Sequence, residues 1–161
     1  MKKFLLALMA LPLMMSLASC HDDDELPDVN INVTYKNAVV VDHQVYVVQG
    51  QEFGIESIVT TAAQEGKNAT NGAVSYWLNG IPVGTTDVQP FAITLAPEWT
   101  QETGSFYIEF VMPVYEEGCA LATAYARVKV NVVASADDIP SPSDGEAPAA
   151  GQTLDHKFND K

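Results

Sequence analysis

The sequence predicts an all-β chain: an antiparallel β-sandwich of about seven to eight strands. Apolar and polar residues alternate with a period of two through most of residues 29–134, as is typical of strands that bury one face. Turn-forming Gly, Asn and Pro residues divide this stretch into short segments, and no window of similar length shows a helical period. Many short strands within about a hundred residues favour two packed antiparallel sheets.

The expected strands are short and follow one another closely. Val74, Tyr76 and Leu78 point to one side, and the Asn79-Gly80 pair that follows is a typical type I′ hairpin turn. Pro113 is expected to end the long apolar alternation at residues 106–112. Strands are predicted at residues 29–35, 53–61, 74–78, 81–85, 91–95, 106–112 and 122–132, with short edge segments at 38–42 and 45–49 and a polar loop at 64–72.

Three segments resemble the immunoglobulin-like and fibronectin-III-like domains common in bacterial surface lipoproteins. They are Val74-Ser75-Tyr76-Trp77-Leu78-Asn79-Gly80, Pro90-Phe91 and Gly104-Ser105-Phe106-Tyr107, which look like parts of strands C, E and F. The resemblance covers residues 29–134 and implies an immunoglobulin-like β-sandwich. Cys20 is expected to be lipidated, as argued below, so Cys119 has no second cysteine with which to bridge the sheets, and packing must hold them together. Such motifs specify a fold far better than a function.

The composition excludes several classes of protein. The 161 residues carry 8 basic and 21 acidic side chains, a formal net charge of -13, so the chain lacks the cations that nucleic-acid binding requires. The two cysteines, Cys20 and Cys119, are too few for a disulfide scaffold or a four-cysteine zinc site. Residues 135–161 are rich in Ser, Pro, Ala, Gly and Asp, and we expect them to form a disordered acidic tail.

The first twenty residues predict a secretion signal. Lys2 and Lys3 precede an apolar run at 4–15, which is too short to cross a bilayer as a helix. The Leu17-Ala18-Ser19-Cys20 segment resembles the lipobox of bacterial lipoproteins. The resemblance implies that residues 1–19 are removed and that the lipidated Cys20 anchors the mature chain in a membrane. An ordinary signal peptide with a cysteine near its cleavage site is the alternative.

A run of carboxylates, Asp22, Asp23, Asp24 and Glu25, follows the cysteine directly. Like charges repel and keep a segment extended, so residues 20–28 are expected to be a disordered, solvated linker. An acidic run at this place also resembles the surface-export signal of Bacteroidota lipoproteins. That resemblance implies an outer-membrane protein whose domain is exposed on the cell surface, and the two interpretations are compatible.

The sequence shows no motif for catalysis, for a metal ion or for a cofactor. There is no Walker loop, no His-Glu-x-x-His pair and no Gly-x-Ser-x-Gly elbow. His21 and His156 lie in the expected tails, and His43 lies in a turn without a serine or cysteine motif beside it. Cys119 follows two glutamates, whose negative charge disfavours a reactive thiolate. We therefore expect that the protein is not an enzyme and that it needs no cofactor.

Side chains alternate between the two sides of a strand, and this alternation along three predicted strands identifies a candidate binding face. If Val74, Tyr76 and Leu78 point into the core, the residues between them point outward, and strands C, F and G are neighbours in an immunoglobulin-like sheet. Aromatic rings beside polar groups stack on sugars or anchor protein partners. The alternative is a set of ordinary cross-strand pairs; Trp99 could extend the face or close the end of the core. The candidate residues are Trp77, Tyr107, Glu109, Tyr125, Arg127 and Lys129.

These observations favour a surface lipoprotein that binds rather than catalyses. Its partner is expected to be a glycan or an outer-membrane protein, for example in a nutrient-uptake complex. The alternative is a structural or adhesive subunit similar to type V fimbrial subunits. Those subunits are usually cleaved after an arginine ahead of the first strand, whereas Arg127 is the sole arginine of this chain.

Overall fold

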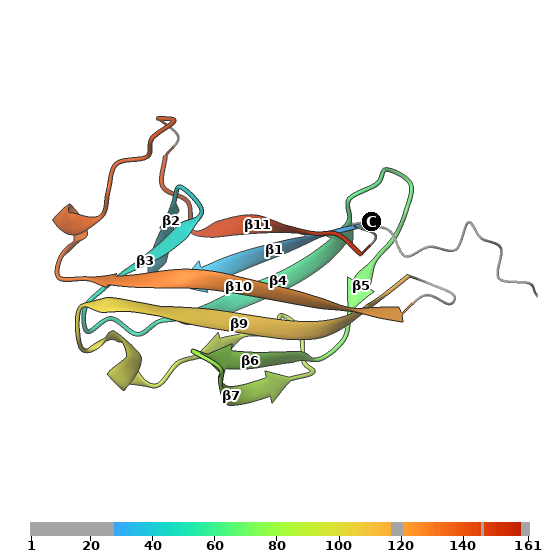
Figure 1. Cartoon of the computed structure of the whole chain (residues 1–161), viewed down its shortest axis with the longest axis horizontal. Helices are drawn as coiled ribbons and strands as arrows, with labels where there is room; N and C mark the ends of the chain where they lie inside the picture. Colours follow the sequence, from blue (N-terminus) through green and yellow to red (C-terminus); the bar gives the residue numbers. More distant parts are fainter. Residues whose placement is uncertain (1–27, 117–120, 146, 159–161) are drawn as a thin grey trace, which may run out of the picture.

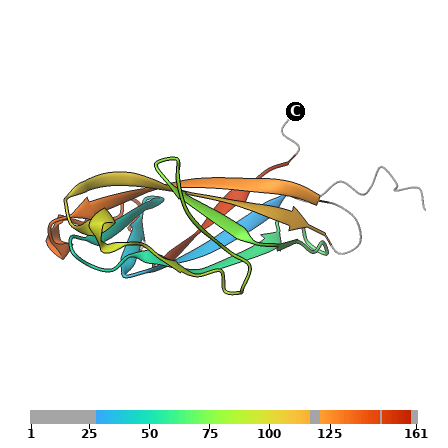
Figure 2. The same cartoon turned by 90° about the horizontal axis from the view of Figure 1, so that it is seen from below.

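The computed structural model describes residues 28–116, 121–145 and 147–158, which form two β-sheets packed face to face (Figures 1 and 2). The strands are β1 (Val29–Lys36), β2 (Ala38–Val41), β3 (Gln44–Val48), β4 (Gly54–Ala62), β5 (Thr70–Asn71), β6 (Val74–Leu78), β7 (Ile81–Thr86), β8 (Ile93–Thr94), β9 (Gly104–Tyr115), β10 (Leu121–Val133) and β11 (Gly151–His156). Two short 3-10 helices, η1 (Pro97–Thr100) and η2 (Ala136–Asp138), lie in the connections.

The strand order confirms the predicted immunoglobulin-like sandwich. One sheet has the order β11-β1-β4-β8, and the other has the order β2-β3-β10-β9-β6-β7, with β5 pairing to β9. The neighbours β6, β9 and β10 correspond to strands C, F and G of that fold, and β1, β4 and β8 to strands A, B and E. The long pair β9 and β10 runs along the whole domain (Figure 1).

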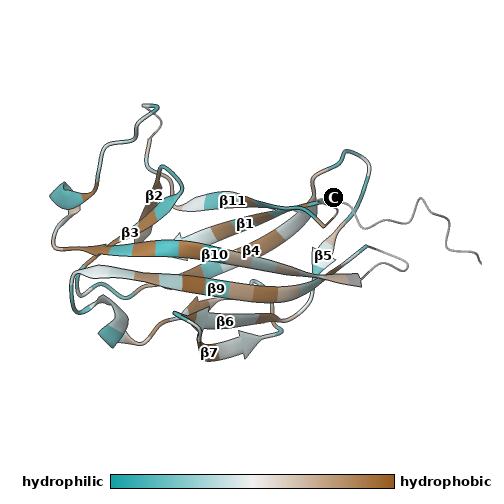
Figure 3. Cartoon of the chain, in the orientation of Figure 1, coloured by the Kyte–Doolittle hydropathy of each residue, from teal (hydrophilic) through white to brown (hydrophobic). Residues whose placement is uncertain are grey.

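The core is built from the inward residues of both sheets, as the alternation predicts. Every second residue is buried along β1 and β6, from Phe106 to Val114 in β9 and from Ala124 to Val132 in β10, and apolar residues recur along these strands in Figure 3. Phe53 links the sheets, with its ring centroid 6.2 Å from that of Tyr35 on β1 and 6.0 Å from that of Phe106 on β9. Burial of this apolar surface is the main stabilising contribution to the fold.

Tyr76 provides a polar link between the two sheets. It lies on β6, it is 1% exposed, and its hydroxyl donates a hydrogen bond to the carbonyl of Phe91, just before β8. Burial raises the pKa of Tyr76 above its ordinary value. The hydroxyl therefore stays protonated and satisfies a carbonyl that is shielded from water.

Two strand boundaries differ from the sequence prediction. Pro113 does not end β9, which continues to Tyr115. The Pro113 carbonyl accepts a hydrogen bond from the Gly72 N–H. The side of Pro113 that lacks an N–H group therefore faces the interruption between β5 and β6, where no strand is positioned to accept a hydrogen bond from it. The strand expected at 91–95 shrinks to β8, because Phe91 has φ 62° and lies in a turn. The type I′ turn is confirmed by φ 49° at Asn79 and 79° at Gly80.

The expected disorder of the C-terminal segment is wrong for residues 151–156. These residues form β11, which pairs antiparallel with β1 from Val29↔His156 to Thr34↔Gly151. Gln152 Nε2 donates to the Tyr35 hydroxyl at 2.7 Å, and Leu154 packs against the core. Burial raises the pKa of Tyr35 to about 12, although the hydrogen bond from Gln152 opposes this shift. An edge strand is held largely by backbone pairing, which explains why its polar composition did not reveal it.

Candidate functional site

The structure brings the six predicted residues together on the outward side of β6, β9 and β10, and we call this surface the outer face. Trp77 pairs with Glu109, and Glu109 pairs with Arg127, so these three form one row across the sheet. Tyr107 and Lys129 are paired in an adjacent row on the same side. Tyr125 lies two residues before Arg127 on β10. The outer face therefore combines residues that are up to 52 positions apart in the chain.

Arg127 occupies the centre of the outer face and has two partners there. Its guanidinium carbon lies 3.8 Å from the ring centroid of Tyr107, a cation–π contact. Its Nε lies 3.3 Å from Oε1 of Glu109, whose side chain is 17% exposed while that of Arg127 is 50% exposed. The guanidinium is therefore fixed in place yet open to solvent on its other side.

The two aromatic residues that flank this centre differ in exposure. Tyr125 is 47% exposed, whereas Trp77 is half-buried between its neighbours on β9 and β7, where its cross-strand partner is Pro82. Tyr107 is 36% exposed, but the Arg127 guanidinium covers part of its ring. Stacking on this surface is therefore available chiefly at Trp77 and Tyr125.

The sequence analysis did not identify Tyr46, an aromatic residue on the outward side of this sheet. Tyr46 on β3 lies beside Asn131 of β10, because β3 pairs with β10 in parallel. Its parity with Asn131 places Tyr46 on the outward side, where it is half-buried beside Ala136 and Ile139 of the following segment. The sequence shows a strand at this place, but a parallel pairing to the last strand has no local signal.

Trp99 does not belong to the outer face. It lies in η1, at the end of the sandwich, with its ring centroid 5.4 Å from that of Phe106, and it packs against the core. Thr100 fixes this turn, because its hydroxyl donates to the Gln51 carbonyl at 2.7 Å. Of the two roles considered for Trp99, the structure supports closure of the core.

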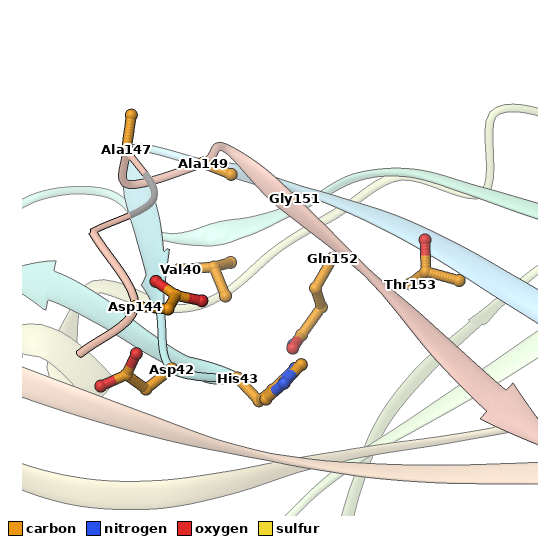
Figure 4. Close-up of a pocket in the computed structure, with 9 residues that line it drawn as sticks. All are labelled: Val40, Asp42, His43, Asp144, Ala147, Ala149, Gly151, Gln152 and Thr153. Atoms are coloured by element: carbon orange, nitrogen blue, oxygen red, sulfur yellow. The ribbon is translucent and has the colours of Figure 1, made fainter. Parts of the chain in front are cut away.

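A pocket of about 270 Å³ lies beside His43, between the β2–β3 turn and the segment that leads into β11 (Figure 4). Asp42, Asp144 and Gln152 contribute to its lining. The Asp42 carboxylate accepts hydrogen bonds from the backbone N–H and hydroxyl of Ser143, at 3.2 and 3.0 Å. Ser143 is thus bonded to the carboxylate and not to the imidazole, which is not the nucleophile–base arrangement of a hydrolase. These bonds hold the segment before β11 against the turn.

The described residues offer neither a metal-ion site nor a membrane-spanning helix. Within them, no three His, Cys, Asp or Glu side chains are arranged to hold a metal ion. No helix in this part of the chain has the length and apolar character needed to cross a bilayer. Three features predicted from the sequence lie outside the described residues: Cys20 as the lipidation residue, the acidic run from Asp22 to Glu25, and the thiol of Cys119.

Comparisons with known proteins add little to this picture. No protein-family model matches the chain. A search of curated proteins found no match either. Among solved structures, the chain is similar to the fibronectin(III)-like modules of Clostridium thermocellum CbhA, with 17% identity over 61% of this chain and 94% of that chain and a TM-score of 0.33. The assignment of the fold therefore rests on the strand order itself.

Proposed function

We propose that the protein is a non-catalytic binding module whose outer face holds a glycan or an outer-membrane protein. The observation that carries the proposal is the row of Trp77, Glu109 and Arg127, in register across three strands and flanked by the exposed ring of Tyr125. Aromatic rings beside charged and hydrogen-bonding groups are typical of surfaces that recognise sugars and protein partners. A regular sheet also holds such groups more rigidly than a loop would.

The test is a double variant, Trp77→Ala with Tyr125→Ala, in the full-length protein. Each ring is expected to contribute about 0.5 to 1.5 kcal/mol beyond burial, so retention on polysaccharides or on outer-membrane extracts should weaken at least several-fold. Thermal unfolding shows whether the variant remains folded. Tyr115→Ala is the matched control: Tyr115 is 38% exposed on the same strand as Tyr107 but about 27 Å further along it. A folded double variant that binds like the parent would contradict the proposal.

The proposed location is the outer membrane, with Cys20 as the lipid anchor and the domain displayed at the cell surface. The sandwich begins at Val29, so residues 20–28 would connect the anchor to the domain. Cys20→Ala should release the protein from the membrane fraction or block its processing. Replacement of Asp22, Asp23, Asp24 and Glu25 by Ala should keep the anchor but protect the domain from protease added to whole cells. Equal cleavage of both forms would make the acidic run a spacer alone.

A structural or adhesive subunit is the second candidate, and β7 is the observation that favours it. Among the described strands, none pairs with the outer edge of β7, and its residues Ile81 and Val83 are 57% and 37% exposed. Uncovered apolar edges pair with other chains, although Pro82 within the strand opposes such pairing. Self-association that Ile81→Lys abolishes would favour this candidate over the binding module.

A further inference from the structure

The arrangement of cations on the outer face indicates the chemical class of the ligand. Five of the chain's eight cations lie in the described residues. Lys36 and Lys67 form ion pairs with Glu52 and Glu116, respectively, and Lys157 follows β11, which belongs to the other sheet. Arg127 and Lys129 are two residues apart on β10 and point to the same side, about 7 Å apart along the strand. This face therefore concentrates cations in a chain whose net charge is -13.

Arg127 is prepared to bind an anion. A guanidinium has five N–H donors in a plane, and the Nε edge of Arg127 faces Glu109. None of the described residues accepts a hydrogen bond from its Nη groups. The contact with the Tyr107 ring and the ion pair restrain the side chain, so little conformational entropy remains to be lost on binding. A fixed guanidinium edge matches the geometry of a carboxylate or a sulfate.

Lys129 adds a second positive charge that has no partner of its own. Within the described part of the chain, no carboxylate lies within ion-pair distance of its ammonium group. Glu109 offsets one of the two cations, so the outer face retains one uncompensated positive charge. At physiological ionic strength, charges are screened beyond about 8 Å. Acidic groups farther away than this therefore contribute little to the local charge.

The same pattern disfavours a protein as the occupant. Trp, Tyr and Arg are enriched in protein–protein interfaces, but Lys and Glu are depleted, especially at the centre. Glu109 and Lys129 are therefore the residues that argue against a protein partner. Here the centre is the charged group of Glu109, Arg127 and Lys129, and the aromatic rings of Trp77 and Tyr125 lie at its sides. Trp77 is two strand spacings, about 10 Å, from Arg127. Rings spaced from fixed cations in this way fit a polymer of sugar rings that carry acidic groups.

We infer that the outer face binds an anionic polysaccharide, one whose sugars carry carboxylate or sulfate groups. This inference rests on the proposed function of the same face. Trp77 and Tyr125 stack against sugar rings, while Arg127 and Lys129 bind the acidic substituents. Tyr107 serves as the support for Arg127 and not as a stacking surface.

The experiment compares matched polysaccharides on the full-length protein in 0.15 M salt, which corresponds to physiological ionic strength. Polygalacturonate is paired with its methyl ester, and dextran sulfate with dextran, so that each pair differs mainly in charge. We expect each acidic member, or the one whose acidic group fits, to bind at least about tenfold more tightly than its neutral partner. Lys129→Gln should weaken that binding about threefold to tenfold. Lys157→Gln removes the same charge outside the outer face and should leave the affinity unchanged.

The outcomes separate this inference from the proposed function. Equal binding of acidic and neutral members, lost in the Trp77 and Tyr125 double variant, would overturn the anionic preference and keep the binding face. A second result would also overturn the anionic preference and keep the binding face. In that result, none of the four polysaccharides binds, whereas the parent captures an outer-membrane protein that the double variant does not capture. Equal losses in Lys129→Gln and Lys157→Gln would also overturn the inference, since general charge would then explain the binding. Acidic polysaccharide binding that the double variant retains would contradict the proposed function.

Discussion

Gly151 tests whether the C-terminal strand is an integral part of the sandwich. It begins β11 opposite Thr34 of β1. A Cβ atom at this position would lie 2.4 Å from the carbonyl oxygen of Val33 and 3.2 Å from the Cα of Thr34. Both are backbone atoms of a strand that pairs on both sides, so they cannot yield as a flexible side chain would. Gly151→Ala should therefore push the start of β11 away from β1.

The size of the effect follows from what β11 contributes. Displacement would break the hydrogen bond from Gln152 to the Tyr35 hydroxyl, which contributes about 1 kcal/mol. It would also loosen the packing of the half-buried Leu154, another contribution of about 1 kcal/mol. The released segment regains conformational entropy, which limits the net cost. We expect the free energy of unfolding to fall by about 1 to 3 kcal/mol, with complete undocking of β11 as the upper limit.

Urea denaturation measures this change, and amide hydrogen exchange along β1 locates it. Gly84→Ala is the matched control, because a Cβ there would meet only Ile93 Cδ1 at an ordinary 3.4 Å. That variant should be neutral or slightly more stable, since glycine has more conformational entropy to lose on folding. Unchanged stability and unchanged β1 exchange in Gly151→Ala would refute the reasoning and return residues 151–156 to a detached tail.

Two buried tyrosines give further predictions. Tyr76→Phe should lower the free energy of unfolding by about 1 to 3 kcal/mol in the same denaturation assay, because the buried Phe91 carbonyl loses its hydrogen-bond donor. Tyr115→Phe is the control: this ring is exposed, so the free energy of unfolding should change by less than about 0.5 kcal/mol. The pKa of Tyr35 is about 12 when folded and 10.0 in the absence of burial, so the unfolded chain releases its proton first and stability falls as pH rises from about 10 to 12. Tyr35 accounts for up to about 3 kcal/mol of that loss. The free energy of unfolding of Tyr35→Phe, measured by denaturation across this pH range, should therefore fall less steeply than that of the parent. Equal slopes in the two proteins would contradict the assignment.

The strands and their inward faces could be predicted from the sequence, because side-chain direction alternates strictly along a strand. Val74, Tyr76 and Leu78 are all buried, and the alternation that places them inward places Trp77 outward. The row of Trp77, Glu109 and Arg127 needed one more assumption, the strand order of an immunoglobulin-like sheet. That order is present, so the composition of the outer face followed from sequence parity.

The edges of the sheets could not be predicted in this way. The strand β11 contains a single large apolar residue, Leu154, and it is fixed by backbone pairing with β1, which any sequence can supply. The parallel pairing of β3 with β10 joins segments more than eighty residues apart, and no local pattern encodes such a contact. Pro113 was misleading because its effect depends on whether its N–H side meets a neighbouring strand.

The contact between Arg127 and Tyr107 changes what the outer face can do. Parity counts three outward aromatic rings, but it does not show that one of them lies under a guanidinium 3.8 Å from its centroid. The covered ring no longer offers its face to a sugar, and in exchange it holds a cation in a fixed orientation next to Glu109. A surface that appears aromatic from the sequence is therefore chiefly a charged surface with two stacking positions at its sides. Because Tyr107 supports Arg127 and does not stack on a ligand, the charge of the ligand should govern the selectivity of the outer face more than stacking on its aromatic rings does.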